Sequence, residues 1–154
     1  EGNTGALLKL GRQWLSHNPR HPDRWLVQLK MAGVLAQAKQ DGEAAALYDS
    51  LSKMGVELPA FDMLRYADVL ARLHRREAAL AMYKRAVVAG LEPDQEAWAQ
   101  VQMVQLARGV KRDDFARNGL RALSVSQDSL VRRLAAVLET DVQEAKAGQG
   151  GKKP

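Results

Sequence analysis

Residues that could act in acid–base chemistry or hold a metal are few in this chain, and their spacing suits neither task. The chain has three histidines and no cysteine, so thiolate ligands and thiolate nucleophiles are excluded. His17 and His21 are four residues apart, but Pro19 would break the helix needed to place both on one face. His74 lies in a predicted turn, and we interpret all three histidines as surface residues.

The other groupings of reactive residue types have structural explanations. Asp113 and Asp114 stand at a predicted helix start, where the helix dipole stabilises carboxylates. The glycines do not form a phosphate-binding loop, and no constellation of serine, histidine and acid is evident. We therefore expect a protein that is not an enzyme and that has no cofactor or metal site.

The elements that hold these residues are predicted to be helices. The chain of 154 residues is 46% hydrophobic and only 5% aromatic, and this alanine- and leucine-rich mixture favours helices over sheets. No apolar run of about 18 residues is present, so we expect a soluble protein without a membrane span, either periplasmic or cytoplasmic. The chain begins at Glu1 without a targeting segment, and we expect it to be part of a longer protein.

The basic character of the chain raises the question of a nucleic-acid partner. Its formal charge is +5 and its isoelectric point is near 9.7. The 23 basic residues are spread along the predicted helices among 18 acidic residues. This pattern is typical of solvated helix faces and argues against nucleic-acid binding.

The stretch from Pro59 to Asp94 is predicted to be a complete helix–turn–helix unit, and its features recur on both sides. Its second half carries Ala79, Tyr83 and Ala86, which are four and three residues apart and therefore share one helical face. A face of small, large and small residues lets a neighbouring helix approach closely. The pattern returns 35 residues earlier and more loosely 37 residues later, at Ala44, Tyr48 and Leu51 and at Ala116, Leu120 and Leu123.

The predicted units have regular boundaries. Proline opens each unit, at Pro22, Pro59 and Pro93. The first turn of a helix tolerates a residue that has no amide hydrogen. Gly55 and Gly90, again 35 residues apart, are predicted to end two second helices. We predict a single array over 1–146, followed by a flexible tail at 147–154. The array would begin with the second helix of a truncated repeat at 5–19 and end with a capping helix at 126–146. Between them we predict three repeats, at 22–58, 59–92 and 93–125.

Two further expectations concern turns and core packing. Asp41–Gly42 and His74–Arg76 are predicted to form the turns inside the first two complete units. Trp14, Trp25 and Trp98 each fall on an apolar helical face, so we expect all three to pack in the core.

Over about 5–123 these units resemble tetratricopeptide repeats. That family places an aromatic residue early in the first helix, a small residue in its middle, and alanine, aromatic and alanine on the second helix. The second-helix triples match the last part of this pattern, and the first-helix positions are matched by Trp25 and Trp98, by Ala32 and Ala67, and by Leu35 and Leu70. The resemblance implies an all-α fold, a right-handed superhelical α-solenoid of antiparallel helix pairs with about eight helices.

The resemblance also implies a function. Such arrays are non-catalytic scaffolds that bind a peptide segment or partner protein in a concave groove formed by successive first helices. Polar residues that recur on those helices at the repeat spacing are therefore the candidates for contacting a partner. They form three pairs that are 34 or 35 residues apart: Lys30 with Arg65, Gln37 with Arg72, and Asp68 with Gln102.

The family and the composition suggest a biological setting. The alanine-, arginine- and leucine-rich usage indicates a bacterial protein. Within the family, such arrays serve in larger bacterial assemblies and in envelope systems for secretion and export. The open N-terminal end predicted here would leave an apolar edge that could support self-association.

Single-stranded RNA is the alternative partner. Gly90–Asp94 and Gly55–Pro59 also resemble the closing motif of pentatricopeptide repeats, which read one base per unit. Arg65 and Ala99 stand where that family requires a base-reading asparagine, threonine or serine. We therefore expect a protein partner instead of RNA.

Overall fold

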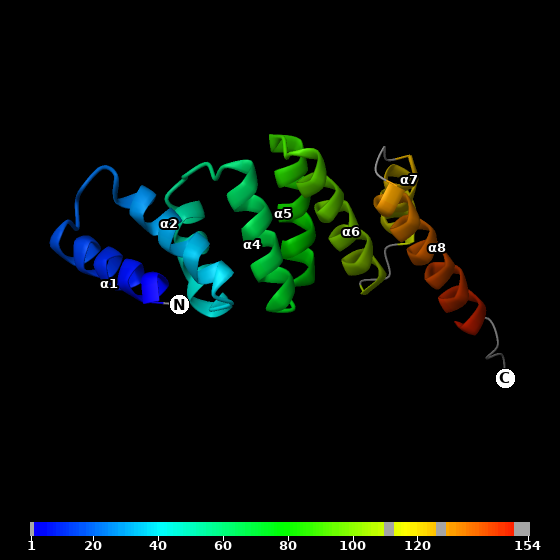
Figure 1. Ribbon diagram of the computed structural model, residues 1–154, viewed down its shortest axis with the longest axis horizontal. Helices are drawn as coiled ribbons and strands as arrows, with labels where there is room; N and C mark the ends of the chain where they lie inside the picture. The colour runs from blue at the N-terminus through cyan, green and yellow to red at the C-terminus, as the bar shows by residue number, and fades with distance from the viewer. Residues whose placement is uncertain (1, 110–112, 126–128, 150–154) are drawn as a thin grey trace. The chain divides into compact units, whose positions relative to one another are not determined.

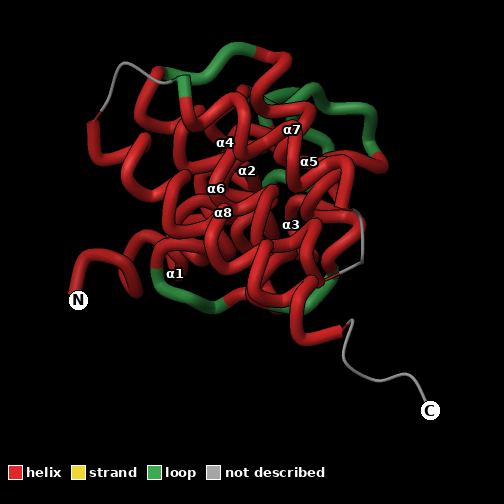
Figure 2. The backbone as a smooth tube through the Cα atoms, turned by 90° about the vertical axis from the view of Figure 1, so that its right-hand side faces the viewer, coloured by secondary structure: helices red, strands yellow, loops and turns green. Residues whose placement is uncertain are grey.

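The chain is all-α, as the sequence predicts. The computed structural model describes residues 2–109, 113–125 and 129–149, and within these ranges it contains eight α-helices (Figure 1). The described residues outside the helices are loops and turns, and no strand occurs among them (Figure 2). None of the described helices is long and apolar enough to cross a membrane.

The chain divides into two compact units, Glu1–Gly90 and Leu91–Pro154. The first unit contains five helices: α1 (Gly2–His17), α2 (Arg24–Gln37), α3 (Asp41–Lys53), α4 (Ala60–Arg72) and α5 (Arg76–Ala89). Each helix packs on the next, and α2 also packs on α4. The expected pairing of neighbouring helices is thus confirmed, whereas the single array over 1–146 and its handedness stay predictions.

The second unit contains α6 (Pro93–Gly109), α7 (Asp113–Ser124) and α8 (Ser129–Gln149). α7 packs on both of the others, and α6 also contacts α8. α8 continues through Gln149, so the first three residues of the predicted tail are helical. The residues at 110–112, 126–128 and 150–154 lie outside the described part. The core of this unit is formed by Val101, Val104, Ala107, Leu120, Leu123, Ala135 and Leu138.

The repeated small, large, small faces form the centre of the first unit. Tyr48 and Tyr83 occupy equivalent positions on α3 and α5, and both are fully buried. Their flanking residues on the same faces, Ala44, Leu51, Ala79 and Ala86, are likewise 0% exposed. This part of the sequence prediction is confirmed. In the looser third copy, Leu120 and Leu123 are buried, and the side chain of Ala116 lies outside the described part.

α4 illustrates why these segments are helical. It follows Pro59 and carries Asp62 in its first turn and Arg72 in its last, so both charges favour the helix dipole. Its apolar residues recur at helical spacing and are buried against the neighbouring helices: Met63, Leu64, Tyr66, Ala67, Val69 and Leu70.

The prediction for one internal turn is wrong. Asp41 and Gly42 lie inside α3, and the turn before it is made by 38–40. Lys39 adopts a left-handed conformation there (φ 56°), and His74 does so 35 residues later (φ 59°). In each turn the next amide donates five residues back, from Gln40 to Leu35 and from Arg75 to Leu70. This hydrogen bond ends a helix without requiring glycine. Gly55 and Gly90 have positive φ as expected.

The prediction that all three tryptophans pack in the core is also wrong. Trp98 is 49% exposed, because the neighbouring Ala99 and Val101 take the buried positions of α6. Trp14 and Trp25 are only half-buried. α2 is the one described helix that packs on α1, and it leaves part of Trp14 accessible to solvent.

Candidate partner-binding surface

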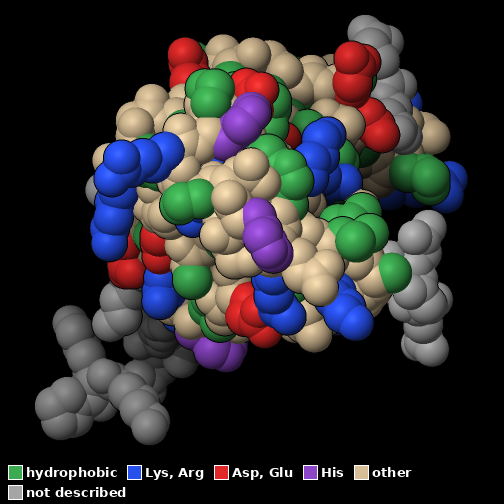
Figure 3. Space-filling model, turned by 90° about the vertical axis from the view of Figure 1, so that its left-hand side faces the viewer, with side chains coloured by type: hydrophobic (Ala, Val, Ile, Leu, Met, Phe, Trp, Pro, Cys, Tyr) green, Lys and Arg blue, Asp and Glu red, His purple; other side chains and the backbone are tan. Residues whose placement is uncertain are grey.

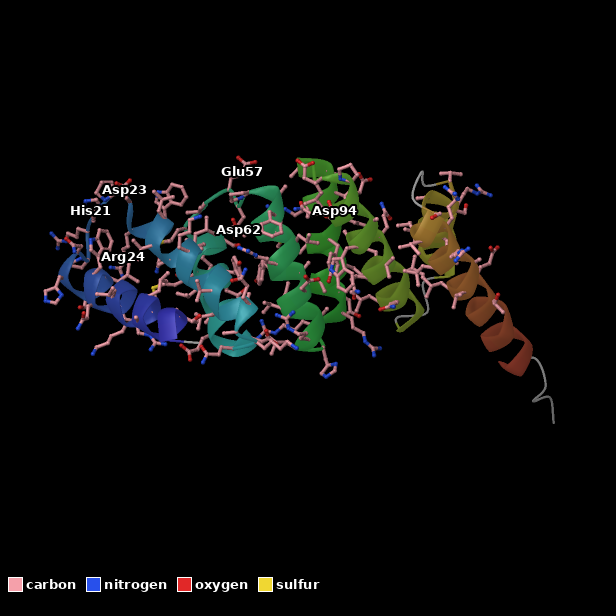
Figure 4. The ribbon with its side chains drawn as sticks, in the orientation of Figure 1. His21, Asp23, Arg24, Glu57, Asp62 and Asp94 are labelled. Carbon is pink, nitrogen blue, oxygen red and sulfur yellow. The ribbon has the colours of Figure 1, made fainter. Side chains whose placement is uncertain are left out.

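The first helices of the two predicted repeats in the first unit, α2 and α4, pack directly on one another. Lys30 on α2 and Arg65 on α4 both act on Asp62, which reaches from α4 toward α2 (Figure 4). The charges of two predicted groove residues thus act on one carboxylate, from which Arg65 lies 3.8 Å away. Lys30 is exposed, whereas the Arg65 side chain is 28% exposed.

Arg65 is held against the wall that α2 and α4 form. Its Nη1 lies 3.8 Å from Oδ1 of Asp62, and its guanidinium carbon lies 4.2 Å from the centre of the Phe61 ring. A Cβ at Gly33 of α2 would lie only 3.0 Å from Nη1, so the guanidinium crosses α2 at a residue without a side chain. Arg65 therefore presents a positioned cation at the α2–α4 junction.

Asp62 is the half-buried acid at this junction. Burial raises its pKa above the ordinary value of 3.8, while the positive charges of Arg65 and Lys30 oppose that shift. The buried Tyr48 hydroxyl lies beside Asp62 but makes no hydrogen bond of normal geometry. The junction thus combines two cations with one carboxylate whose pKa burial raises.

Arg72 supports the fold at the end of the wall. Its Nε donates to both carboxylate oxygens of Asp41, at 3.0 and 2.9 Å, and its Nη2 donates to Oδ1 at 2.7 Å. Nη2 also lies 3.2 Å from the Ala36 carbonyl oxygen. Because Asp41 begins α3, this fork joins the end of α4 to the turn between α2 and α3. The hydrogen bond to Asp41 raises the pKa of Arg72.

Asp68 is also engaged by a neighbouring helix. It accepts a hydrogen bond from the Tyr83 hydroxyl, which burial and this bond hold protonated by raising its pKa. A second tyrosine, Tyr66 of α4, donates to Asp49 of α3 in the same way. Each of these carboxylates also has an arginine near it, Arg72 for Asp68 and Arg75 for Asp49.

The last two predicted groove residues are Gln37 and Gln102. Gln37 is exposed at the last residue of α2, next to the Ala36 carbonyl that Arg72 contacts. Gln102 is half-buried on α6 and belongs to the second unit. The structure therefore brings Lys30 and Arg65 together, places Asp68 and Arg72 in fold-supporting contacts, and leaves Gln102 in the second unit.

An apolar groove between α1 and α2 was not assigned from the sequence. It has a volume of about 940 Å³, and Lys30 lines it together with hydrophobic residues of both helices. The signal was present in α1, whose apolar residues fall on two sides instead of one. Periodicity could not show which of these sides α2 would cover.

The described histidines do not form a metal site. His17 and His21 are exposed, and His21 lies 4.0 Å from Asp23 in the loop before α2 (Figure 4). His74 occupies the left-handed position of the turn before α5. Within the described ranges, no group of three or more potential ligands could hold a metal ion.

No protein-family model matches this chain, and no curated protein or solved structure is significantly similar to it. The resemblance to tetratricopeptide repeats therefore stays a prediction. The packing of its helices in neighbouring pairs rests on the structure itself.

Proposed function

We propose that this chain is a non-catalytic scaffold of the tetratricopeptide type, which binds a peptide segment or partner protein along the wall formed by α2 and α4. The direct packing of these two first helices supports the proposal most strongly. It brings Lys30 and Arg65 to one surface, although they are 35 residues apart in the chain. A partner there would meet the positioned guanidinium of Arg65 and the exposed Lys30 on a helical support.

Lys30 and Arg65 are the residues of this wall most suited to contact a partner. Arg72 is already bound through two nitrogens to Asp41, and Asp68 accepts the Tyr83 hydroxyl. Replacing either of these would disturb the fold as well as the surface. The test therefore concerns Lys30 and Arg65 alone.

The experiment uses the purified chain as bait for proteins from the native cell, followed by titration of the captured partner. The double variant Lys30→Ala/Arg65→Ala should lose the partner while its helical circular dichroism stays unchanged. Lys53→Ala/Arg85→Ala is the matched control, because both residues are exposed cations on other helices. Equal capture by both double variants would contradict the proposal.

Single-stranded RNA remains the competing ligand class to be tested. Micromolar or tighter binding of a mixed RNA pool that weakens steeply with salt would replace the proposal, because such salt dependence reports phosphate contacts. Service in a bacterial secretion or export assembly stays a prediction based on residue usage and on the family.

A further inference from the structure

The groove between α1 and α2 has an apolar lining that is open to solvent. Leu7, Leu10 and Trp14 line it from α1, and their spacing of three and four residues places them on one face. Leu7 is 41% exposed and Leu10 is 65% exposed. From α2 the lining includes Leu26, which is 40% exposed, and the buried Met31.

The packing of α1 on α2 explains why this face is left open. A Cβ at Gly11 would lie 2.6 Å from Sδ of Met31, so the missing side chain lets the two helices approach closely. Leu8, on another side of α1, is buried. α1 thus has two apolar faces, of which α2 covers one.

The plan of the first unit indicates which kind of element would fit this groove. α2 packs on α1, α3 and α4, whereas α1 packs on α2 alone among the described helices. The lining of α1 extends from Ala6 to His17, about three helical turns. A helix laid along α1 and α2 would continue the pairing that the other helices of the unit already show.

The charge around the groove indicates the chemistry of that helix. The segment 2–37 carries five basic residues and one acidic residue, Asp23. Arg12 is paired with Glu43 at 2.7 Å, and Arg24 donates to the Leu15 carbonyl oxygen at 2.8 Å. The other three basic residues, Lys9, Arg20 and Lys30, are exposed, and Lys30 lies on the rim of the groove. At this end of the unit, hydrophobic side chains lie among basic, acidic and histidine side chains (Figure 3).

We propose that the α1–α2 groove binds an acidic amphipathic helix of a partner protein. Its apolar stripe would cover Leu7, Leu10 and Leu26, and a carboxylate beside that stripe would face Lys30. This inference rests on the proposed function and deepens it, because it names the partner chemistry at the end of the α2–α4 wall. Apolar burial supplies most of the affinity, and Lys30 selects the sign of the partner's charge.

The test uses two synthetic amphipathic helices of about five turns with the same leucine stripe, one flanked by glutamates and the other by lysines. Fluorescence anisotropy of the labelled peptides measures their binding to the purified chain. The glutamate peptide should bind more tightly. Leu10→Gln should weaken it roughly tenfold or more, which corresponds to the burial of one leucine. Lys30→Glu should weaken it roughly fivefold and shift the preference toward the lysine peptide.

Two matched variants control for nonspecific effects. Val88→Gln removes another exposed apolar side chain, 87% exposed on α5, and Lys53→Glu makes the same charge change as Lys30→Glu on α3. Both should bind the glutamate peptide as the unaltered chain does. Equal binding of the two peptides, or a Leu10→Gln variant that binds normally, would overturn the inference.

Two further outcomes separate this inference from its alternatives. If the chain self-associates and Leu10→Gln abolishes that association while no peptide binds, a second copy occupies the groove and the inference is wrong. If Leu10→Gln keeps the native partner and Lys30→Ala/Arg65→Ala loses it, the groove assignment fails while the proposed function stands.

Discussion

Tyr48 and Tyr83 offer a comparison in which the same substitution should have different consequences. They are 35 residues apart, both are 0% exposed, and each is the large residue of a small, large, small face. The Tyr83 hydroxyl donates to Asp68, whereas the buried Tyr48 hydroxyl lies beside Asp62 without a hydrogen bond of normal geometry. Replacing each by phenylalanine removes one oxygen and leaves the rings in place.

The change in stability for each variant depends on the hydrogen bond that the removed hydroxyl made. A hydrogen bond to a charged group contributes about 1.5 to 3 kcal/mol to stability. Asp68 is only half-buried, so water can replace part of the bond, and we expect Tyr83→Phe to cost about 1.5 kcal/mol. The Tyr48 hydroxyl makes no hydrogen bond of normal geometry, so its removal gives up less and also removes part of a desolvation penalty, and Tyr48→Phe should cost less than Tyr83→Phe.

Urea denaturation followed by far-ultraviolet circular dichroism measures the difference. Both variants should unfold with the same dependence on urea concentration as the unaltered chain, so that a shift in midpoint reports stability. Tyr83→Phe should have the lower free energy of unfolding, by about 1 to 2 kcal/mol relative to Tyr48→Phe. An equal or larger loss for Tyr48→Phe would refute the reasoning, because the hydrogen bond from Tyr83 to Asp68 would then not decide the difference.

Three further predictions follow from the same structure. His74→Gly should raise the free energy of unfolding by about 1 kcal/mol in urea titrations, because His74 adopts a left-handed conformation that glycine adopts more easily; a decrease would contradict this. Gly119→Ala should lower the melting temperature, because its Cβ would lie 2.6 Å from Cγ2 of the fully buried Val104. The Cβ of Gly42→Ala on α3 would meet nothing within 4 Å, and alanine favours a helix more than glycine does, so this variant should raise the melting temperature. Equal shifts for the two variants would refute the packing argument. Burial raises the pKa values of the three tyrosines above 10.0, so at alkaline pH the folded chain binds more protons than the unfolded chain. The protonated tyrosines therefore stabilise the fold, and this contribution to the free energy of unfolding is lost as pH rises through the folded pKa values. Ultraviolet titration should therefore show tyrosinate only when circular dichroism reports unfolding, and earlier ionisation would contradict the assignment.

The sequence by itself determined the helical elements and their buried faces. The residues Ala79, Tyr83 and Ala86 share one side of a helix because of their spacing alone, and small residues beside a large one require a close neighbour. Gly55 and Gly90 could be assigned as helix ends because glycine adopts positive φ without steric cost. The turn at Lys39 was missed because its hydrogen bonds stabilise a conformation that residue type does not predict.

The tertiary structure decided which partner each polar residue meets. Lys30 and Arg72 are both basic residues of the predicted groove, yet Arg72 binds Asp41, which is 31 residues away, and Lys30 stays exposed at the rim of the groove. The open face of α1 likewise became visible only when α2 was seen to cover its other side. Periodicity specifies the face on which a residue lies, because it depends on one helix. Contacts between faces depend on how two helices pack, and only the folded chain specifies that.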